Sequence, residues 1–354
     1  MKLLRRLAWT LGVLAVSVGG FLVWVLWPVA ALPPAPQVEA APWNQAPTQS
    51  QTQAAPQYLP SIDPPSIAAT PPDAEDCESG NAPTGAAAIN AASLTSVAWT
   101  PFGRAETGWE IYAPRVAVEI GTACAPSSRR FAAALAQWQA GHGLRPTGVL
   151  DPATFQPMST GWQLARPFAR MNAKGLCPNA PPVSSLATAR PEESYGGKVI
   201  QLRPGALDAY RRMVAEARAA GVVRRPEALT IFSGFRDPAA DAARCARDNN
   251  CQGLVRTICS AHRTGLAMDV YIDAAPGFGP DSSHDTNRRV MAGSALFRWM
   301  VVNAPRFGFA NYPFEPWHWE WAGEALLPGV PISTLPQAGS EPIGAGLEKG
   351  QARF

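Results

Sequence analysis

The 354-residue sequence has little charge for its length: Asp, Glu, Lys and Arg make up 16% of it, and the formal net charge is +3. So small a positive excess does not indicate a nucleic-acid-binding surface. Low charge together with 36 prolines indicates that part of the chain is linker rather than packed domain. The six cysteines include no C-x-x-C pair, which argues against a cysteine zinc cluster. An even number of cysteines is expected where disulfides are stable, and the sequence does not choose among the possible pairings.

The N-terminal residues 1–32, MKLLRRLAWTLGVLAVSVGGFLVWVLWPVAAL, have basic residues first and no charge afterwards. This pattern is typical of an export signal, and the apolar part is long enough to span a bilayer. The basic residues predict that this end stays cytoplasmic while the rest is exported. Val29–Ala31 offers a cleavage site. A released form therefore also fits the sequence, although we favour an uncleaved anchor.

Two regions follow before the part of the chain that carries chemistry. Residues 33–76 are rich in Pro, Ala and Gln without apolar periodicity, which predicts an extended linker. Residues 77–176 contain a helical face at Phe131 and Leu135 and a helix start at Asp151–Pro152. Their order, helix, glycine loop, helix, resembles the small three-helix peptidoglycan-binding module found beside many wall enzymes. A helical spacer without a ligand is the alternative.

Residues 177–328 mix helices and short strands without a regular βαβ rhythm. Periodicity and turn residues predict helices at 206–220 and 288–302, and strands at 229–232, 268–272 and 317–321. The mixture favours an α+β fold, with a small antiparallel sheet and flanking helices. Residues 329–354 are expected to be a C-terminal tail.

Two of the chain's four histidines, His262 and His318, have a carboxylate nearby at a spacing that suits a metal site. His262 precedes Asp269 in SAHRTGLAMD, and Glu315 precedes His318 in EPWHWE. A catalytic zinc site takes three nitrogen or oxygen ligands and keeps one open position, and His262, Asp269 and His318 would supply that set. Gly265 permits a tight turn between the first two of these residues.

Glu315 stands three residues before His318, with Pro316 between them. Because proline interrupts regular pairing, Glu315 is expected to bend over the open metal position as a general base. Taken singly these features are weak. A lone histidine near a glycine is more often a surface residue, and tryptophans such as those beside His318 are more often core.

Together, FSGFRD, SAHRTGLAMD and EPWHWE resemble the VanY-type D-alanyl-D-alanine carboxypeptidases of the LAS group of zinc peptidases. The pattern S-G-Y/F-R, S-x-H-x-x-G-x-A-x-D, E-x-W-H is complete here, and the resemblance covers roughly residues 195–323. One departure is the insertion-like RCARDNNCQGLVRTIC, whose cysteines are expected to staple a loop at the cleft rim. Five residues separate Cys245 from Cys251 and can form a tight loop, which predicts a disulfide between them.

The resemblance implies a zinc cofactor held by His262, Asp269 and His318. It also implies that Glu315 takes a proton from the attacking water and returns it to the leaving amine.

Substrate contacts are implied for three further residues. Arg236 is expected to bind the developing oxyanion or the terminal carboxylate of the substrate. Ser260 is expected either to donate a hydrogen bond to substrate or to brace the turn before His262. Trp317 is expected to wall the substrate pocket.

The expected function is removal of the terminal D-alanine from peptidoglycan stem peptides, in the bacterial periplasm or cell envelope, by an enzyme anchored in the inner membrane. A peptidoglycan endopeptidase or dipeptidase with the same zinc chemistry is one alternative. A wall-binding protein with an inert peptidase domain is the other.

Overall fold

The computed structural model describes residues 74–248, 251, 257–327 and 329–335. The predicted export signal and nearly all of the predicted linker therefore lie outside the described residues. Within the described ranges, no helix has both the length and the apolar character needed to cross a membrane.

The N-terminal part is a small helical region, as the sequence predicts. It contains α2 (Ala74–Cys77), α3 (Ala86–Ser96), α4 (Ala113–Glu119), α5 (Arg129–Gly141), α6 (Pro152–Ala165) and α7 (Pro167–Asn172), with a short hairpin of β1 (Ala98–Trp99) and β2 (Glu106–Thr107). The Asp151 side chain accepts a hydrogen bond from Thr154 N and begins α6. Trp109, Phe131 and Phe155 lie in the buried core of this region, and a Cys77–Cys124 disulfide closes it.

The remaining elements form the region that holds the predicted chemistry. In chain order they are β3 (Leu176–Pro178), η1 (Val183–Ser185), β4 (Ala187–Thr188), η2 (Pro191–Glu193), η3 (Tyr195–Gly197), β5 (Gln201–Leu202), α8 (Pro204–Ala219), β6 (Ile231–Ser233), α9 (Pro238–Arg247), η4 (Ala261–Thr264), β7 (Ala267–Val270), α10 (Asp285–Gly293), α11 (Ala295–Asn303), η5 (Ala304–Phe307), β8 (Phe309–Asn311), β9 (His318–Trp321), β10 (Gly329–Pro331) and η6 (Ile332–Thr334).

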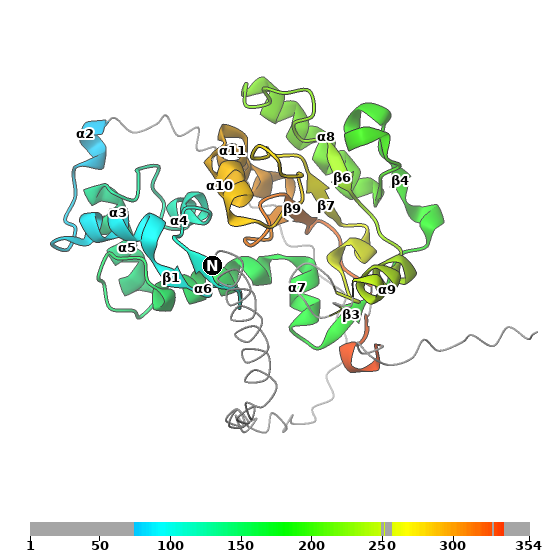
Figure 1. The fold of residues 1–354 in the computed structure, drawn as a ribbon, viewed down its shortest axis with the longest axis horizontal. Helices are drawn as coiled ribbons and strands as arrows, with labels where there is room; N and C mark the ends of the chain where they lie inside the picture. Colours follow the sequence, from blue (N-terminus) through cyan, green and yellow to red (C-terminus); the bar gives the residue numbers. More distant parts are fainter. Residues whose placement is uncertain (1–73, 249–250, 252–256, 328, 336–354) are drawn as a thin grey trace, which may run out of the picture. The chain divides into compact units, whose positions relative to one another are not determined.

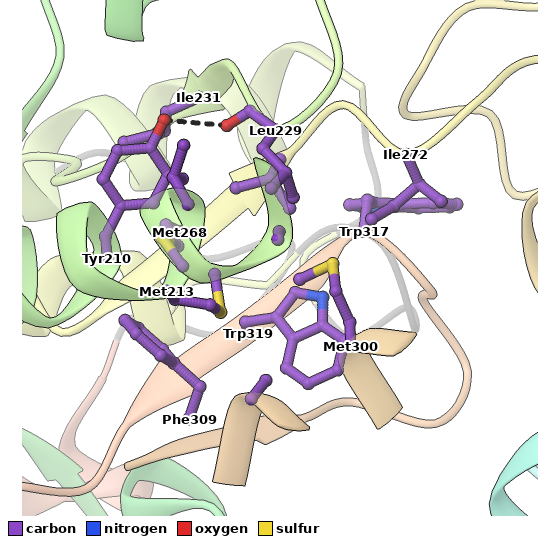
Figure 2. Close-up of a cluster of buried hydrophobic side chains, with 14 of the residues drawn as sticks. Tyr210, Met213, Leu229, Ile231, Met268, Ile272, Met300, Phe309, Trp317 and Trp319 are labelled. Atoms are coloured by element: carbon purple, nitrogen blue, oxygen red, sulfur yellow. Dashed lines mark hydrogen bonds between the residues drawn. The ribbon is translucent and has the colours of Figure 1, made fainter. Parts of the chain in front are cut away.

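The central sheet has the strand order β6-β7-β9-β8, and each neighbouring pair is antiparallel. Figure 1 labels β6, β7 and β9 of this sheet. The predicted α+β class with a small antiparallel sheet is therefore confirmed. Side chains alternate along a strand, so Met268 of β7 and Trp319 of β9 lie in the core with residues of α8 and α11 (Figure 2). Asp269 and His318, one residue along each strand, then lie on the opposite face.

The bounds of several predicted elements differ from the structure, and the strand expected at 268–272 ends at Val270. The helix expected at 288–302 is two helices, because the Ser294 side chain accepts a hydrogen bond from Phe297 N and begins α11. The strand expected at 229–232 begins only at Ile231, because Leu229 has a φ of 67°, outside the extended region. Gly329–Pro331, expected in the tail, form β10 and pair with β3.

A buried arginine joins the helical region to the sheet region. Arg288 of α10 is fully buried and pairs with Glu106 Oε1 at 3.0 Å. It also donates hydrogen bonds to Tyr112 Oη at 2.8 Å and to the carbonyl oxygen of Phe314 at 2.8 Å. Phe314 directly precedes Glu315, so this contact fixes the loop that carries the predicted general base.

Candidate active site

The strand register brings the predicted site residues together. Asp269 of β7 is the direct cross-strand partner of His318 on one side and of Ser233 on the other. His262 approaches from η4, the short 3-10 helix immediately before β7. His262, Asp269 and His318 are all buried, and each offers a ligand atom within 4.8 Å of the others.

Residues on either side of His262 shape the turn that carries it. Ser260 Oγ accepts a hydrogen bond from His262 N at 3.2 Å and begins η4. Gly265 ends it with a φ of 68°, a left-handed conformation that favours glycine. The Nδ1 atom of His262 lies 2.8 Å from the carbonyl oxygen of Gly234, which leaves Nε2 directed at Asp269 Oδ2, 3.1 Å away.

His318 is held between two carboxylates. Its Nδ1 atom lies 2.9 Å from Asp269 Oδ1, and its Nε2 atom lies 3.4 Å from Glu320 Oε1. Glu320, which is 1% exposed, accepts hydrogen bonds from Arg166 Nε at 2.8 Å and Phe168 N at 2.9 Å. The helical region thus contacts a predicted metal ligand through one intervening side chain.

Sequence reasoning missed both Glu320 and Arg166. The alternation of a strand was the available signal for Glu320, because residues two apart share a face. No local signal points to Arg166, which meets Glu320 from 154 positions away.

The electrostatics of this cluster favour charged carboxylates. Burial alone would raise the pKa of Asp269, but His262 and His318 hold it well below its usual range. Burial alone would lower the pKa of His318, yet its hydrogen bonds with Asp269 and Glu320 raise it to about 9. Burial likewise opposes ionisation of Glu320, but Arg166, His318 and the backbone N–H of Phe168 together outweigh burial and lower the pKa to about 2.

Glu315 lies in the tight turn that leads into β9. Glu315 N donates to Tyr312 O at 2.9 Å, and His318 N donates to Glu315 O at 3.0 Å. The amide of Asn311, another residue that sequence reasoning missed, donates to the carbonyl oxygens of Glu315 and His318. The Glu315 side chain is half-buried and faces the cleft that also holds the histidines. Burial raises its pKa to about 7, with the Asp269 charge adding to the effect and His318 opposing it.

Arg236 lines the same cleft and is fixed by two neighbours. Its Nη1 atom lies 2.9 Å from Asp241 Oδ1, and its Nη2 atom donates to Ser233 Oγ at 3.0 Å. Asp241 is 3% exposed, so this ion pair is shielded on the carboxylate side. Sequence reasoning did not identify Asp241.

Ser260 and Trp317 also line the cleft. Trp317 is 2% exposed and belongs to the hydrophobic core, near Ile272 in Figure 2. Its indole therefore packs in the hydrophobic core and also forms part of the cleft wall. Ser260 begins the helical turn before His262, so the bracing role foreseen for it is present in the structure.

The cleft has a volume of about 840 Å³, within the range of ordinary ligand sites. It contains the side chains predicted for chemistry, Arg236, Ser260, His262, Asp269, Glu315 and His318. Asp269 and His318 lie in strands of the central sheet, and His262 lies in η4. Arg236 follows β6 and Glu315 precedes β9, and Ser260 directly precedes η4.

Residues 199–324 match the VanY family model, described as D-alanyl-D-alanine carboxypeptidase. The resemblance expected from the three motifs is thereby confirmed over this range. The search of curated proteins finds no match.

The chain is similar to several solved structures, including the following two. One is the LdcB LD-carboxypeptidase, whose structure is described as revealing the molecular basis of peptidoglycan recognition; it is 23% identical, with 42% of this chain and 75% of that chain covered and a TM-score of 0.32. The other is a mutant of the vancomycin resistance D,D-pentapeptidase VanY in complex with Zn(II); it is 18% identical, with 42% of this chain and 87% of that chain covered and a TM-score of 0.25.

The insertion in the VanY-matching region is stapled as the sequence predicts. The Cys245–Cys251 disulfide is present, which confirms that pairing. Cys259, at the end of the insertion, pairs with Cys177 in β3. Arg244, Thr257 and Cys259 line the cleft, so the insertion contributes to its rim.

The three buried donors fit a zinc ion in their chemistry. Two imidazole nitrogens and one carboxylate oxygen form the type of protein ligand set that catalytic zinc takes. The second nitrogen of each imidazole faces an oxygen atom, of Gly234 for His262 and of Glu320 for His318. Such contacts fix the tautomer and orientation of metal-binding histidines.

Proposed function

We propose that the protein is a zinc-dependent peptidase that releases the terminal D-alanine from peptidoglycan stem peptides. The observation that carries this proposal is the convergence of His262, Asp269 and His318 beside Glu315, within the region that matches the D-alanyl-D-alanine carboxypeptidase family. A protein that only binds peptidoglycan would not need three buried metal-ligand side chains beside a glutamate with a raised pKa.

His262, Asp269 and His318 would hold the metal, and Glu315 would move the protons. When bound, zinc supplies Lewis acidity, which lowers the pKa of a water and polarises the substrate carbonyl. Glu315 takes a proton from the attacking water and gives it to the leaving amine. In the metal-free protein, burial raises its pKa to about 7, and this higher proton affinity favours uptake of the proton from the water. A dication at the neighbouring donors would lower that pKa, because it favours the charged carboxylate.

Arg236 would stabilise negative charge on the substrate. Asp241 and Ser233 hold its guanidinium group at the cleft wall. A planar group with several N–H donors suits a developing oxyanion or a terminal carboxylate. Ser260 and Trp317 would shape the pocket around the substrate terminus.

One observation favours the endopeptidase alternative. The charge of Arg236 is already balanced by buried Asp241, which weakens its attraction for a free terminal carboxylate. An internal peptide bond offers no such carboxylate, so this pairing is compatible with cleavage inside a cross-link.

We also propose that residues 1–32 export the protein and anchor it in the inner membrane, which would place the cleft in the bacterial periplasm. The basic start and the uncharged run that follows support this placement.

In the decisive experiment, purified full-length protein is incubated with two defined muropeptides. One ends in D-Ala-D-Ala, and the other is a cross-linked dimer. We expect D-alanine release that is lost in chelator and restored by zinc. Opening of dimers without D-alanine release would replace the carboxypeptidase by the endopeptidase. Cleavage of neither substrate by zinc-loaded protein would refute the proposed function.

A further inference from the structure

The helical region supplies one wall of the catalytic cleft. Residues of α6 and α7 line the same 840 Å³ cavity as the candidate metal ligands and Glu315. From α6 these are Gln156, Ser159, Thr160, Gln163 and Leu164. The cleft is therefore larger than the peptidase motifs alone would enclose.

The cleft side of α6 is a polar face at helical spacing. Gln156, Ser159, Thr160 and Gln163 stand at positions i, i+3, i+4 and i+7, which share one side of a helix. The other side carries Phe155, Met158 and Trp162, which are buried in the core of the helical region. The rotation of α6 about its axis is thus set by packing, with its polar face on the cavity.

The position of α6 against the sheet region is also fixed. Arg166, directly after α6, pairs with buried Glu320 of β9. A second buried pair, Arg288 with Glu106, joins the two regions elsewhere. A wall held by two buried ion pairs keeps a constant distance from the metal ligands, as a substrate site requires.

The chemistry of this face indicates its ligand. The α6 residues on the cleft offer amide and hydroxyl groups and one exposed leucine, and none of them is charged. The peptide part of peptidoglycan carries carboxylates, which would call for cationic partners. The glycan part presents neutral hydroxyl and N-acetyl groups together with apolar ring faces, and these match amides, hydroxyls and a leucine.

We propose that the polar face of α6 is a subsite for the glycan end of the substrate, with the peptide terminus at His262, Asp269 and His318. This inference rests on the proposed function. It makes the helical region a part of the catalytic cleft rather than a separate wall-binding module.

The test compares two substrates and two variants of the full-length protein. The substrates are a D-Ala-D-Ala pentapeptide with and without its N-acetylglucosamine–N-acetylmuramic acid disaccharide. The test variant is Gln156→Ala/Ser159→Ala/Thr160→Val, which leaves Gln163 in place because its side chain accepts a hydrogen bond from Arg166. The control is Gln137→Ala, at an exposed position of α5 outside the cleft lining.

We expect the test variant to raise KM for the disaccharide-linked substrate about tenfold, the effect of losing a few hydrogen bonds. Its kcat, its zinc content and its KM for the free pentapeptide should match wild type, as should all values for Gln137→Ala. An equal change for both substrates, or no change for either, would overturn the subsite.

Calorimetry with the same two ligands in chelator makes the result independent of turnover. Wild type should bind the disaccharide-linked peptide more tightly than the free peptide, and the test variant should lose that preference. If wild type shows no preference, the glycan subsite is wrong even where D-alanine release is observed. If the preference exists but no bond is cut, the subsite stands and the proposed function fails.

Discussion

Glu320→Gln is the most informative single change, because Glu320 links the helical region to a candidate metal ligand. Glutamine keeps the volume and one acceptor oxygen but removes the charge that faces Arg166 and His318 Nε2. Arg166 would then be left buried without its counter-ion, at 6% exposure. We expect two separable losses, one in zinc affinity and one in folding stability.

The size of the stability loss follows from the electrostatics. Arg166 and the other contacts lower the Glu320 pKa from 4.5 to about 2, which corresponds to about 3 kcal/mol in favour of the folded, ionised state. Breaking a buried ion pair on one side costs a similar amount, about 3 to 5 kcal/mol. Because the folded-state pKa is depressed, this contribution in the metal-free protein is complete above about pH 4.5 and is lost as the pH falls toward 2.

The zinc affinity should fall about 10- to 100-fold, as is typical when the partner of a metal-binding histidine is changed. Chelator competition at neutral pH measures it, and urea unfolding measures stability. Glu106→Gln is the matched control: it breaks the other buried pair, with Arg288, whose guanidinium contacts no candidate metal ligand. The control should lose stability but keep wild-type zinc affinity. Unchanged zinc affinity in Glu320→Gln, or an equal loss in the control, would refute the reasoning.

Three other changes test the remaining assignments. His318→Ala should lose the single zinc that elemental analysis is expected to find in wild type, and full retention would exclude His318 as a ligand. Glu315→Gln should retain zinc and circular dichroism but lose about 10² to 10⁴ in kcat, since glutamine cannot accept the proton; activity within a few-fold of wild type would show that Glu315 is not the base. Arg236→Lys should lower kcat/KM with zinc content unchanged, because lysine keeps the charge but loses the forked donors; full activity would show that the planar geometry is not needed.

The ligand set could be predicted from the sequence because its geometry is local. Gly265 fixes the turn between His262 and β7, and strand alternation fixes the side to which Asp269 points. Only the pairing of β7 with β9 had to be added, and in that register Asp269 lies opposite His318. The motif spacing therefore contained most of the geometry before any long-range contact was known.

Long-range polar contacts could not be predicted in this way. Arg166 and Glu320 are each ordinary in their local sequence, and their meeting depends on how the helical region packs against β9. Within β9, Glu320 lies between Trp319 and Trp321, and its cross-strand partner Ala267 is small. The apolar periodicity of residues 288–302 predicted one helix where the structure has α10 and α11. Periodicity reveals an apolar face, but it does not reveal that Ser294 caps a new helix.

The pattern of charges around the cleft separates one carboxylate from the rest. Glu320 pairs with Arg166, Asp241 with Arg236, and Asp269 contacts both histidines. Among the described residues Glu315 alone of these four carboxylates has no ion-pair partner, and its pKa is raised while those of Asp269 and Glu320 are lowered. Groups whose environments drive their pKa values apart take different roles. The lowered pKa values of Asp269 and Glu320 suit holding a cation or a guanidinium group, whereas the higher proton affinity of Glu315 suits proton transfer. The electrostatics therefore support Glu315 as the base for the same reason that they support Asp269 as a ligand.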